Sequence, residues 1–108
     1  MYIMGHIGDT VYQYSVGGTN LFNENIEIAT GLTTITRCIV TWNADIDPDN
    51  TLTVKVSADG TNYEEVTDSV IHNFEHTGTS LYIRFEDDFV DEDAVDLVYE
   101  YAIIYNPS

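Results

Sequence analysis

Apolar and polar residues alternate in short runs along the chain, most clearly between Thr51 and Phe85. An Asp59-Gly60 pair separates the first two runs, and this pair strongly favours a β-hairpin turn. Residues 77–80, Thr-Gly-Thr-Ser, separate the next two runs and also favour a turn. The pattern therefore predicts two consecutive hairpins in this segment.

The rest of the chain carries the same pattern, with hardly any helical periodicity. Gly, Asn, Asp and Pro separate the runs at short intervals, which is typical of an all-β sandwich or barrel. We expect about eight strands in a single antiparallel, jelly-roll-like β-sandwich. An immunoglobulin-type sandwich is the alternative, although its paired cysteines are missing. Outside the hairpins we expect strands over residues 10–16, 21–29, 33–43 and 97–105, and a short strand or an arm over residues 2–7.

The length of 108 residues corresponds to about one domain. The sequence has no linker, repeat or low-complexity tract, so we expect a single domain over residues 1–108. Residues 1–9 are expected to form an arm that docks on a partner or swaps between protomers. They lack the features of a secretory signal, and no segment approaches the roughly 20 apolar residues of a membrane span. We therefore expect a soluble chain that is made in the cytoplasm.

The charge balance is strongly acidic, with 19 Asp and Glu residues against 3 Lys and Arg, a formal net charge of -16. Such a surface repels phosphate, so binding to nucleic acid or anionic lipid would lack its main electrostatic driving force. We expect neither a nucleic-acid nor a membrane partner. Acidic residues are densest between Glu86 and Glu100. A solvated loop explains this segment, and a hard cation gathered by its carboxylates is the alternative.

Asp45, Asp47 and Asp49 stand at alternate positions of a loop that contains Pro48, a spacing with which carboxylates can surround Ca²⁺. The rest of an EF-hand loop is missing, because Asn50 occupies the position of its Gly. A solvated turn is the favoured interpretation of this loop, and the three aspartates are the candidate metal ligands in the alternative one. We therefore expect no cofactor, with structural Ca²⁺ as the alternative.

Two histidines and one cysteine are candidates for chemistry. His72 and His76 would be about 13 Å apart on an extended strand, at ~3.3 Å per residue, so we do not expect them to share a metal ion. Cys38 is expected to be a small buried hydrophobe. The chain has no G-x-S-x-G turn and no glycine-rich phosphate loop, so we expect no enzymatic activity and no catalytic residues.

Tyrosines offer large contact areas with polar tips, which suits a surface that binds a partner. Four of them are expected at edge or outward-facing positions, and the amino-terminal arm adds apolar side chains. The candidate partner interface comprises Tyr2, Ile3, Met4, Ile7, Tyr12, Tyr14 and Tyr82.

Residues 57–66 read Ser-Ala-Asp-Gly-Thr-Asn-Tyr-Glu-Glu-Val, and His72-x-Phe74 and residues 77–84, Thr-Gly-Thr-Ser-Leu-Tyr-Ile-Arg, follow. Together they resemble a β-sandwich module of the structural proteins of tailed bacteriophages. Arg84, at the end of this pattern, is expected to pair with a neighbouring carboxylate.

The resemblance implies a virion structural protein. The most specific function that it implies is that of a capsid decoration, or cement, protein, which binds the assembled phage head and stabilises the junctions between capsid subunits. The partner would be the major capsid protein and the location the capsid surface, after synthesis in the host cytoplasm. Such modules are often homo-oligomers, in many cases trimers. A tail or host-recognition module that binds cell-surface glycan is the alternative.

Overall fold

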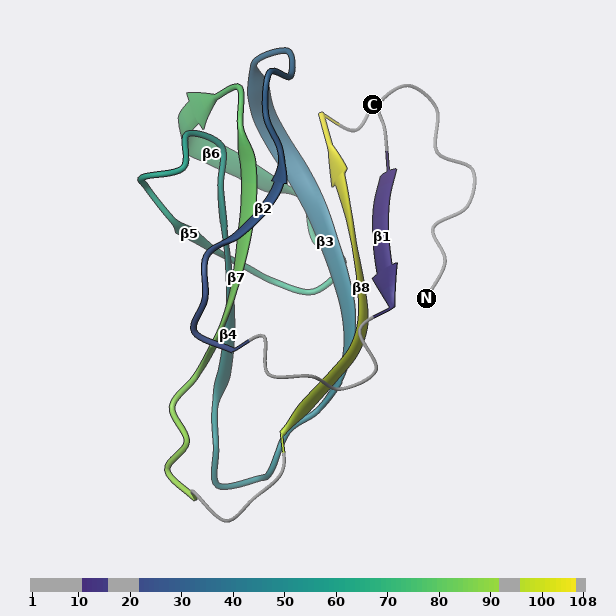
Figure 1. The fold of residues 1–108 in the computed structure, drawn as a ribbon, viewed down its shortest axis with the longest axis vertical. Coiled ribbons are helices and arrows are strands. Elements are labelled where there is room, and N and C mark those ends of the chain that lie inside the picture. Colours follow the sequence, from purple (N-terminus) through teal and green to yellow (C-terminus); the bar gives the residue numbers. More distant parts are fainter. Residues whose placement is uncertain (1–10, 16–21, 92–95, 107–108) are drawn as a thin grey trace.

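The computed structural model describes residues 11–15, 22–91 and 96–106, with side chains from residue 22 onward. The regular elements in this part of the chain are all β-strands (Figure 1). No helix that could cross a membrane occurs among these residues. The strands are β1 (Val11–Ser15), β2 (Ile26–Ala29), β3 (Ile35–Asp45), β4 (Leu52–Ser57), β5 (Glu64–Val66), β6 (His72–Gly78), β7 (Leu81–Asp87) and β8 (Leu97–Tyr105).

The eight strands of the described residues form two antiparallel sheets of four, in the orders β1-β8-β3-β6 and β2-β7-β4-β5. Every connection between successive strands passes from one sheet to the other, except the one from β4 to β5. This strand order is that of a jelly roll. The predicted all-β, jelly-roll-like sandwich is therefore confirmed.

The two predicted hairpins have different outcomes. The first is present, because β4 pairs with β5 across the Asp59-Gly60 turn. The second is wrong, because β6 pairs with β3 whereas β7 pairs with β2 and β4. At this connection the Ser80 N–H donates to the Ala58 carbonyl at 3.0 Å, and the chain changes sheet. A turn sequence predicts a reversal of direction, but it does not determine which sheet the next strand joins.

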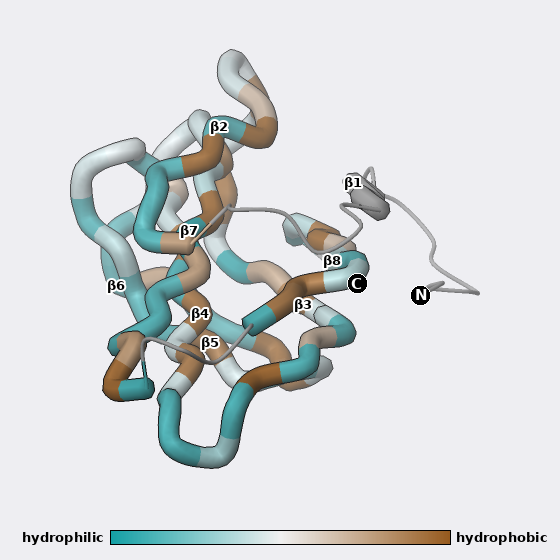
Figure 2. The backbone as a smooth tube through the Cα atoms, turned by 60° about the horizontal axis from the view of Figure 1, so that its bottom comes forward, coloured by the Kyte–Doolittle hydropathy of each residue, from teal (hydrophilic) through white to brown (hydrophobic). Residues whose placement is uncertain are grey.

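The core lies between the two sheets and consists of the inward-facing residues of the alternating runs. In β7, Leu81, Ile83 and Phe85 are fully buried, and the residues between them are half-buried. The Phe85 ring meets the Tyr101 ring of β8 at a centroid distance of 5.0 Å, which links the two sheets. Burial of a side chain of this size contributes about 1.5–3 kcal/mol. In Figure 2 hydrophobic and hydrophilic colours alternate along these strands.

β8 departs from strict alternation at Tyr99. The register between β3 and β8 shifts between Asn43 and Ala44, and Tyr99 is passed over in the ladder. Tyr99 is 39% exposed, whereas Val98 and Tyr101 are both buried. A bulge of this kind moves the inward-facing positions by one residue.

The antiparallel pair β4–β7 has two ends with different chemistry. We call the end where β4 runs into Asp59 and β7 begins the turn end. We call the opposite end, at the bottom of Figure 1, the acidic end. There, residues 46–51 lead from β3 into β4, and residues 88–91 and Asp96 belong to the connection from β7 to β8. The candidate site lies at the acidic end.

Candidate functional site

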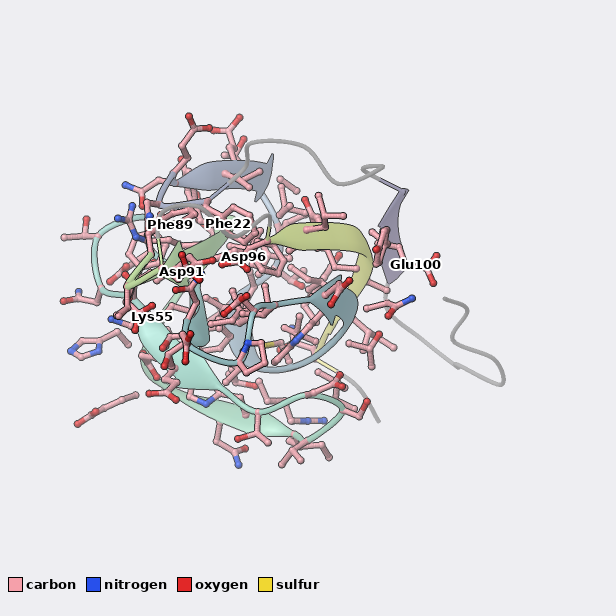
Figure 3. All side chains as sticks on the ribbon, turned by 90° about the horizontal axis from the view of Figure 1, so that it is seen from below. Phe22, Lys55, Phe89, Asp91, Asp96 and Glu100 are labelled. Atoms are coloured by element: carbon pink, nitrogen blue, oxygen red, sulfur yellow. The ribbon has the colours of Figure 1, made fainter. Side chains whose placement is uncertain are left out.

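Aspartates from two distant parts of the sequence come together at the acidic end, which Figure 3 views from below. Two follow β3, one ends β7, and two lie between β7 and β8. This acidic cluster consists of Asp47, Asp49, Asp87, Asp91 and Asp96.

Asn50 joins the two connections that carry the cluster. Its side chain is buried. The Asn50 amide oxygen accepts a hydrogen bond from the Asp91 N–H at 2.7 Å, and the Asn50 Nδ2 donates to Asp96 Oδ2 at 2.7 Å. The Thr51 N–H also donates to the Asp88 carboxylate at 2.9 Å. These bonds fix residues 46–51 against the segment that follows β7.

Asp96 is a buried carboxylate whose two oxygens both accept hydrogen bonds. It is 8% exposed. The Asp47 N–H donates to Oδ1 at 2.8 Å, and the Asn50 amide donates to Oδ2. The neighbouring Asp87 carboxyl, together with these N–H donors, lowers the pKa of Asp96 against the opposing effect of burial.

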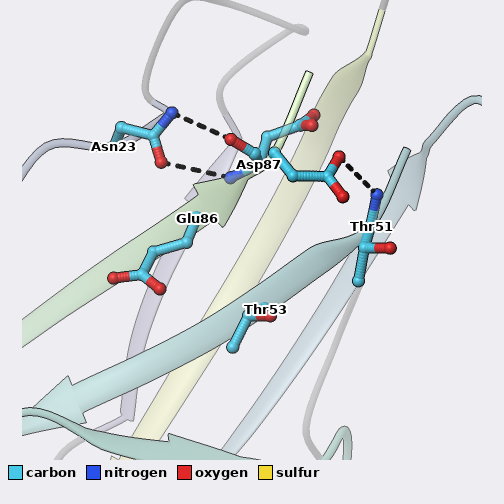
Figure 4. A pocket seen from close by; sticks show the side chains of 6 residues that line it. Asn23, Thr51, Thr53, Glu86 and Asp87 are labelled. Atoms are coloured by element: carbon cyan, nitrogen blue, oxygen red, sulfur yellow. Dashed lines mark hydrogen bonds between the residues drawn. The ribbon is translucent and has the colours of Figure 1, made fainter. Parts of the chain in front are cut away.

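Asp87 is also buried, but its charge is poorly compensated. It is 6% exposed, and its Oδ1 accepts a hydrogen bond from the Phe89 N–H at 2.9 Å. Its Oδ2 accepts no hydrogen bond from an N–H or hydroxyl donor among the described residues, and its carboxyl group shares a proton with that of Asp96. Burial and the adjacent Asp96 carboxylate raise the pKa of Asp87 to about 6. In Figure 4 its side chain points away from Thr53 and toward β8.

The other three members of the cluster offer carboxylate oxygens that lie close together. One oxygen each from Asp47, Asp49 and Asp91 lies within 4.8 Å of the others. Oxygens bound to one Ca²⁺ at 2.3–2.6 Å are at most about 5 Å apart, so the three have the span of a Ca²⁺ site. Asp45 is outside this group, because it ends β3 and pairs with Leu97. The structure thus brings together two of the three predicted ligands and adds Asp91.

A pocket lined by polar residues adjoins the cluster on the side of β4 and β7 (Figure 4). At its rim, Asn23 exchanges two hydrogen bonds of 3.2 Å with the backbone of Asp87. Glu86 forms ion pairs with Lys55 at 3.1 Å and with Arg84 at 2.9 Å, which confirms the expected pairing of Arg84. The pocket is lined by Asn23, Thr51, Thr53, Glu86, Asp87 and Asp88.

Exposed large apolar residues occur as adjacent pairs in two connections. Val90 is 70% exposed next to Phe89, whose ring contacts Phe22 edge-on at 5.7 Å. Val70 and Ile71 form the second pair, directly before β6. Single exposed apolar residues are ordinary, whereas adjacent pairs indicate surfaces that can be covered by a partner.

The predicted partner interface is only partly described. Tyr2, Ile3, Met4 and Ile7, with the rest of the proposed arm over residues 1–9, lie outside the described residues. The backbone of Tyr12 and Tyr14 belongs to β1 and pairs with β8. Tyr82 is half-buried in β7, and its hydroxyl donates to Glu27 at 3.1 Å. Tyr82 and β1 belong to different sheets.

His72 and His76 are closer than the ideal strand predicts. His72 Nε2 lies 2.9 Å from Glu64 Oε1, and His76 Nδ1 lies 3.3 Å from Glu64 Oε2. Two ring nitrogens bound to one carboxylate cannot be 13 Å apart, so the predicted separation is wrong. β6 is irregular here, since the Glu75 and His76 N–H groups both donate to Glu64 at 2.9 Å. Despite burial, these bonds lower the pKa of Glu64.

Cys38 is fully buried in β3, as expected. Burial, with a smaller effect of Glu64, raises the pKa of its thiol to about 12. A thiol in this state is not a nucleophile near neutral pH.

The fold and the acidic end are the features of this chain that bear on its function. The fold and site define an all-β jelly-roll sandwich with an acidic, oxygen-rich end. No protein-family model matches the chain, and comparisons with curated proteins and with solved structures give no significant match.

Proposed function

We propose that this chain is a non-enzymatic structural protein of a bacteriophage virion, most specifically a decoration protein that binds the assembled head. The observation that supports a binding role is the pairing of exposed apolar residues, Val70 with Ile71 and Phe89 with Val90, on an otherwise strongly acidic surface. Such pairs can anchor a partner at the centre of an interface. The resemblance of residues 57–84 to phage structural modules points to a capsid as that partner.

A decoration protein acts by binding the assembled shell and not its free subunits. Binding to one state stabilises that state by mass action, without any chemical step. The major capsid protein is the proposed partner. The resemblance also favours a homo-oligomer, and in particular a trimer. The mass of the purified chain in solution tests this oligomeric state.

Co-sedimentation with empty phage heads tests the proposal directly. The heads should come from the phage that encodes the chain, and free capsid subunits should serve as the negative partner. We expect saturable binding to heads only, and at least a tenfold weaker affinity for Val90→Ser, because apolar anchors carry much of the energy of an interface. Thr67→Ser, at another exposed position, is the matched control and should bind as the wild type. Absence of binding to heads would contradict the proposal.

A tail or host-recognition module that binds cell-surface glycan is the second candidate. The pocket beside β4 and β7 favours it, because hydroxyl, amide and carboxylate groups such as those of Thr53, Asn23 and Glu86 suit the hydroxyl groups of a sugar. Binding to host-surface glycan, lost in Thr53→Val and not matched by any binding to heads, would support this candidate over the first.

A further inference from the structure

We propose that the acidic end is the face of the chain that meets its partner, and that it fits a basic surface, rich in Lys or Arg, with an apolar pocket at its centre. Phe89 and Val90 are the apolar anchors, and the carboxylates around them form a charged rim. This assignment rests on the proposed function, and it gives the capsid surface a definite chemistry. It also selects one of the two exposed apolar pairs as the contact.

Phe89 is held in place although it is exposed. Its N–H donates to Asp87 Oδ1 at 2.9 Å, its backbone φ is 47°, and its ring meets that of Phe22 edge-on at 5.7 Å. Phe89 is nonetheless 37% exposed, and Val90 beside it is 70% exposed. A side chain that is fixed before binding loses little conformational entropy in the complex, and aromatic anchors carry much of the energy of an interface. The other exposed pair contains no aromatic residue.

Carboxylates surround this pair on the surface. Asp88 precedes it and Asp91 follows it in the chain. Asp49 lies on the neighbouring connection, where one of its carboxylate oxygens is within 4.8 Å of one of Asp91. Asp49 and Asp88 are exposed, and neither forms an ion pair among the described residues. An apolar centre with a polar rim is the usual arrangement of a protein–protein interface.

The acidic end has little positive charge of its own. The two connections at this end contain no Lys, Arg or His. Of the three cations in the chain, Lys55 and Arg84 form ion pairs with Glu86 at 3.1 Å and 2.9 Å. The third, Arg37, lies near the start of β3, whereas the acidic end follows the last residue of that strand. Positive charge to balance the exposed carboxylates therefore has to come from a partner.

A basic surface on the partner compensates the charged rim, whereas a neutral or acidic surface does not. Interactions between charges at a rim mainly speed association, and salt weakens them. Apolar anchors at the centre of an interface mainly slow dissociation. A basic partner surface therefore predicts two kinetic effects that can be measured separately.

Binding kinetics of the full chain on immobilised empty heads, measured in about 0.1 M and about 1 M NaCl, test the assignment. Between these concentrations the Debye length falls from about 10 Å to about 3 Å. We expect the wild-type affinity to fall by about tenfold or more, chiefly because association becomes slower. Val90→Ser should instead raise the dissociation rate by about tenfold at both concentrations.

Asp88→Asn removes one rim charge and leaves an amide oxygen that can accept the Thr51 N–H. In about 0.1 M NaCl it should slow association by about threefold, with little change in dissociation. Asp49→Asn should reproduce this effect from the other connection. Glu75→Gln is the matched control: it removes the same charge from an exposed residue of β6, which pairs with the first part of β3, and it should bind as the wild type.

Circular dichroism of each variant separates loss of binding from loss of folding. Saturable binding to heads that does not weaken with salt would overturn the basic surface and leave the proposed function intact. Equal effects of Asp88→Asn and Glu75→Gln, or a loss of binding in Ile71→Ser that Val90→Ser does not show, would have the same consequence. Absence of binding to heads at both salt concentrations would overturn the proposed function itself, and this assignment with it.

Discussion

The two ends of the β4–β7 pair hold a carboxylate in opposite ways. At the turn end, the Asp59 carboxylate accepts hydrogen bonds from the Asn62 and Thr61 N–H groups at 2.8 Å and from the Ser57 hydroxyl at 2.9 Å. These donors, the Asn62 N–H foremost, hold the pKa of Asp59 well below its usual range. At the acidic end, burial and Asp96 raise the pKa of Asp87 to about 6. The same side chain thus has opposite acidity at the two ends.

The difference separates scaffold from candidate site. N–H groups around Asp59 complete a turn in which Gly60 adopts a positive φ of 79°. The charge of the Asp59 carboxylate is therefore compensated by donors within the turn. The charge of Asp87 has no such compensation. Asp87 instead shares a proton with Asp96, because two buried carboxylates that face each other cannot both stay ionised at low cost. The Asp59 turn therefore belongs to the scaffold, whereas the acidic cluster at the other end is the candidate site.

The largest expected effect comes from adding a side chain where two backbone segments lie close together at the turn end. A Cβ at Gly78 would overlap the carbonyl oxygen of Ala58, which is backbone and cannot move aside. Gly78→Ala should therefore lower the free energy of unfolding by about 3 kcal/mol or more, as measured by chemical denaturation.

Gly31→Ala is the control for this prediction. No atom lies within 4 Å of a Cβ at Gly31, although its φ of +68° disfavours alanine. That strain alone should lower the free energy of unfolding by about 1–2 kcal/mol. Equal losses for the two variants would show that backbone approach is not what holds the turn end together.

The next largest effect should follow removal of the acceptor at Asp59. Asp59→Ala leaves the Thr61 and Asn62 N–H groups without their carboxylate, and we expect a loss of about 1–2 kcal/mol in the free energy of unfolding, as for a helix N-cap. Asp59→Asn keeps one acceptor oxygen and should lose less. The pKa of Asp59 is lowered by folding, so its contribution is present above its unfolded pKa and disappears as the pH falls. If Asp59→Asn lost as much unfolding free energy at neutral pH as Asp59→Ala, the acceptor role would be contradicted.

The acidic end should respond in the opposite direction. Asp87→Asn removes the buried charge and places an amide donor beside Asp96, so the free energy of unfolding at pH 7.5 should rise by about 1–2 kcal/mol. Asp88→Asn is the control, because Asp88 is exposed and its carboxylate already accepts the Thr51 N–H. It should not stabilise the protein.

The same variant gives a pH test. Folding raises the pKa of Asp87 from its ordinary value of 3.8 to about 6. The folded state therefore binds the proton more tightly, and stability falls as the pH rises from about 4 to about 6. Asp96, whose pKa is lowered, acts at lower pH and with the opposite sign. Asp87→Asn should therefore lose much less stability than the wild type between pH 4 and 6. An unchanged pH profile would show that Asp87 is not the source of this loss.

Much of the fold follows from local patterns, because alternation and turn residues act over a few positions. They predict the strands of the β4–β5 hairpin and the strand over residues 33–43, which is β3. Local patterns fail where contacts between distant segments determine the sheet or the register of a strand. The turn at Ser80 leads to a different sheet, and the bulge at Tyr99 depends on the register with β3.

Only separate parts of the site could be predicted from the sequence. The spacing of Asp47 and Asp49 and the acidic segment that contains Asp91 are both visible, but their meeting depends on Asn50, which is separated from Asp91 by 41 positions. The burial of Asp87 did have a signal. Asp87 continues the inward-facing series of β7 after Phe85, so alternation alone places this carboxylate inside.

The smallest expected effect concerns an exception to the well-satisfied turn end. The Tyr63 hydroxyl is buried without a hydrogen-bond partner among the described residues, and burial raises its pKa. Tyr63→Phe should therefore increase the free energy of unfolding slightly, by up to about 1 kcal/mol, because a buried unpaired hydroxyl is removed. Tyr82→Phe removes a hydroxyl that donates to Glu27, and it should give no increase. Differential scanning calorimetry of both variants decides the point, since an equal gain would reflect hydroxyl removal in general and not the unpaired state of Tyr63.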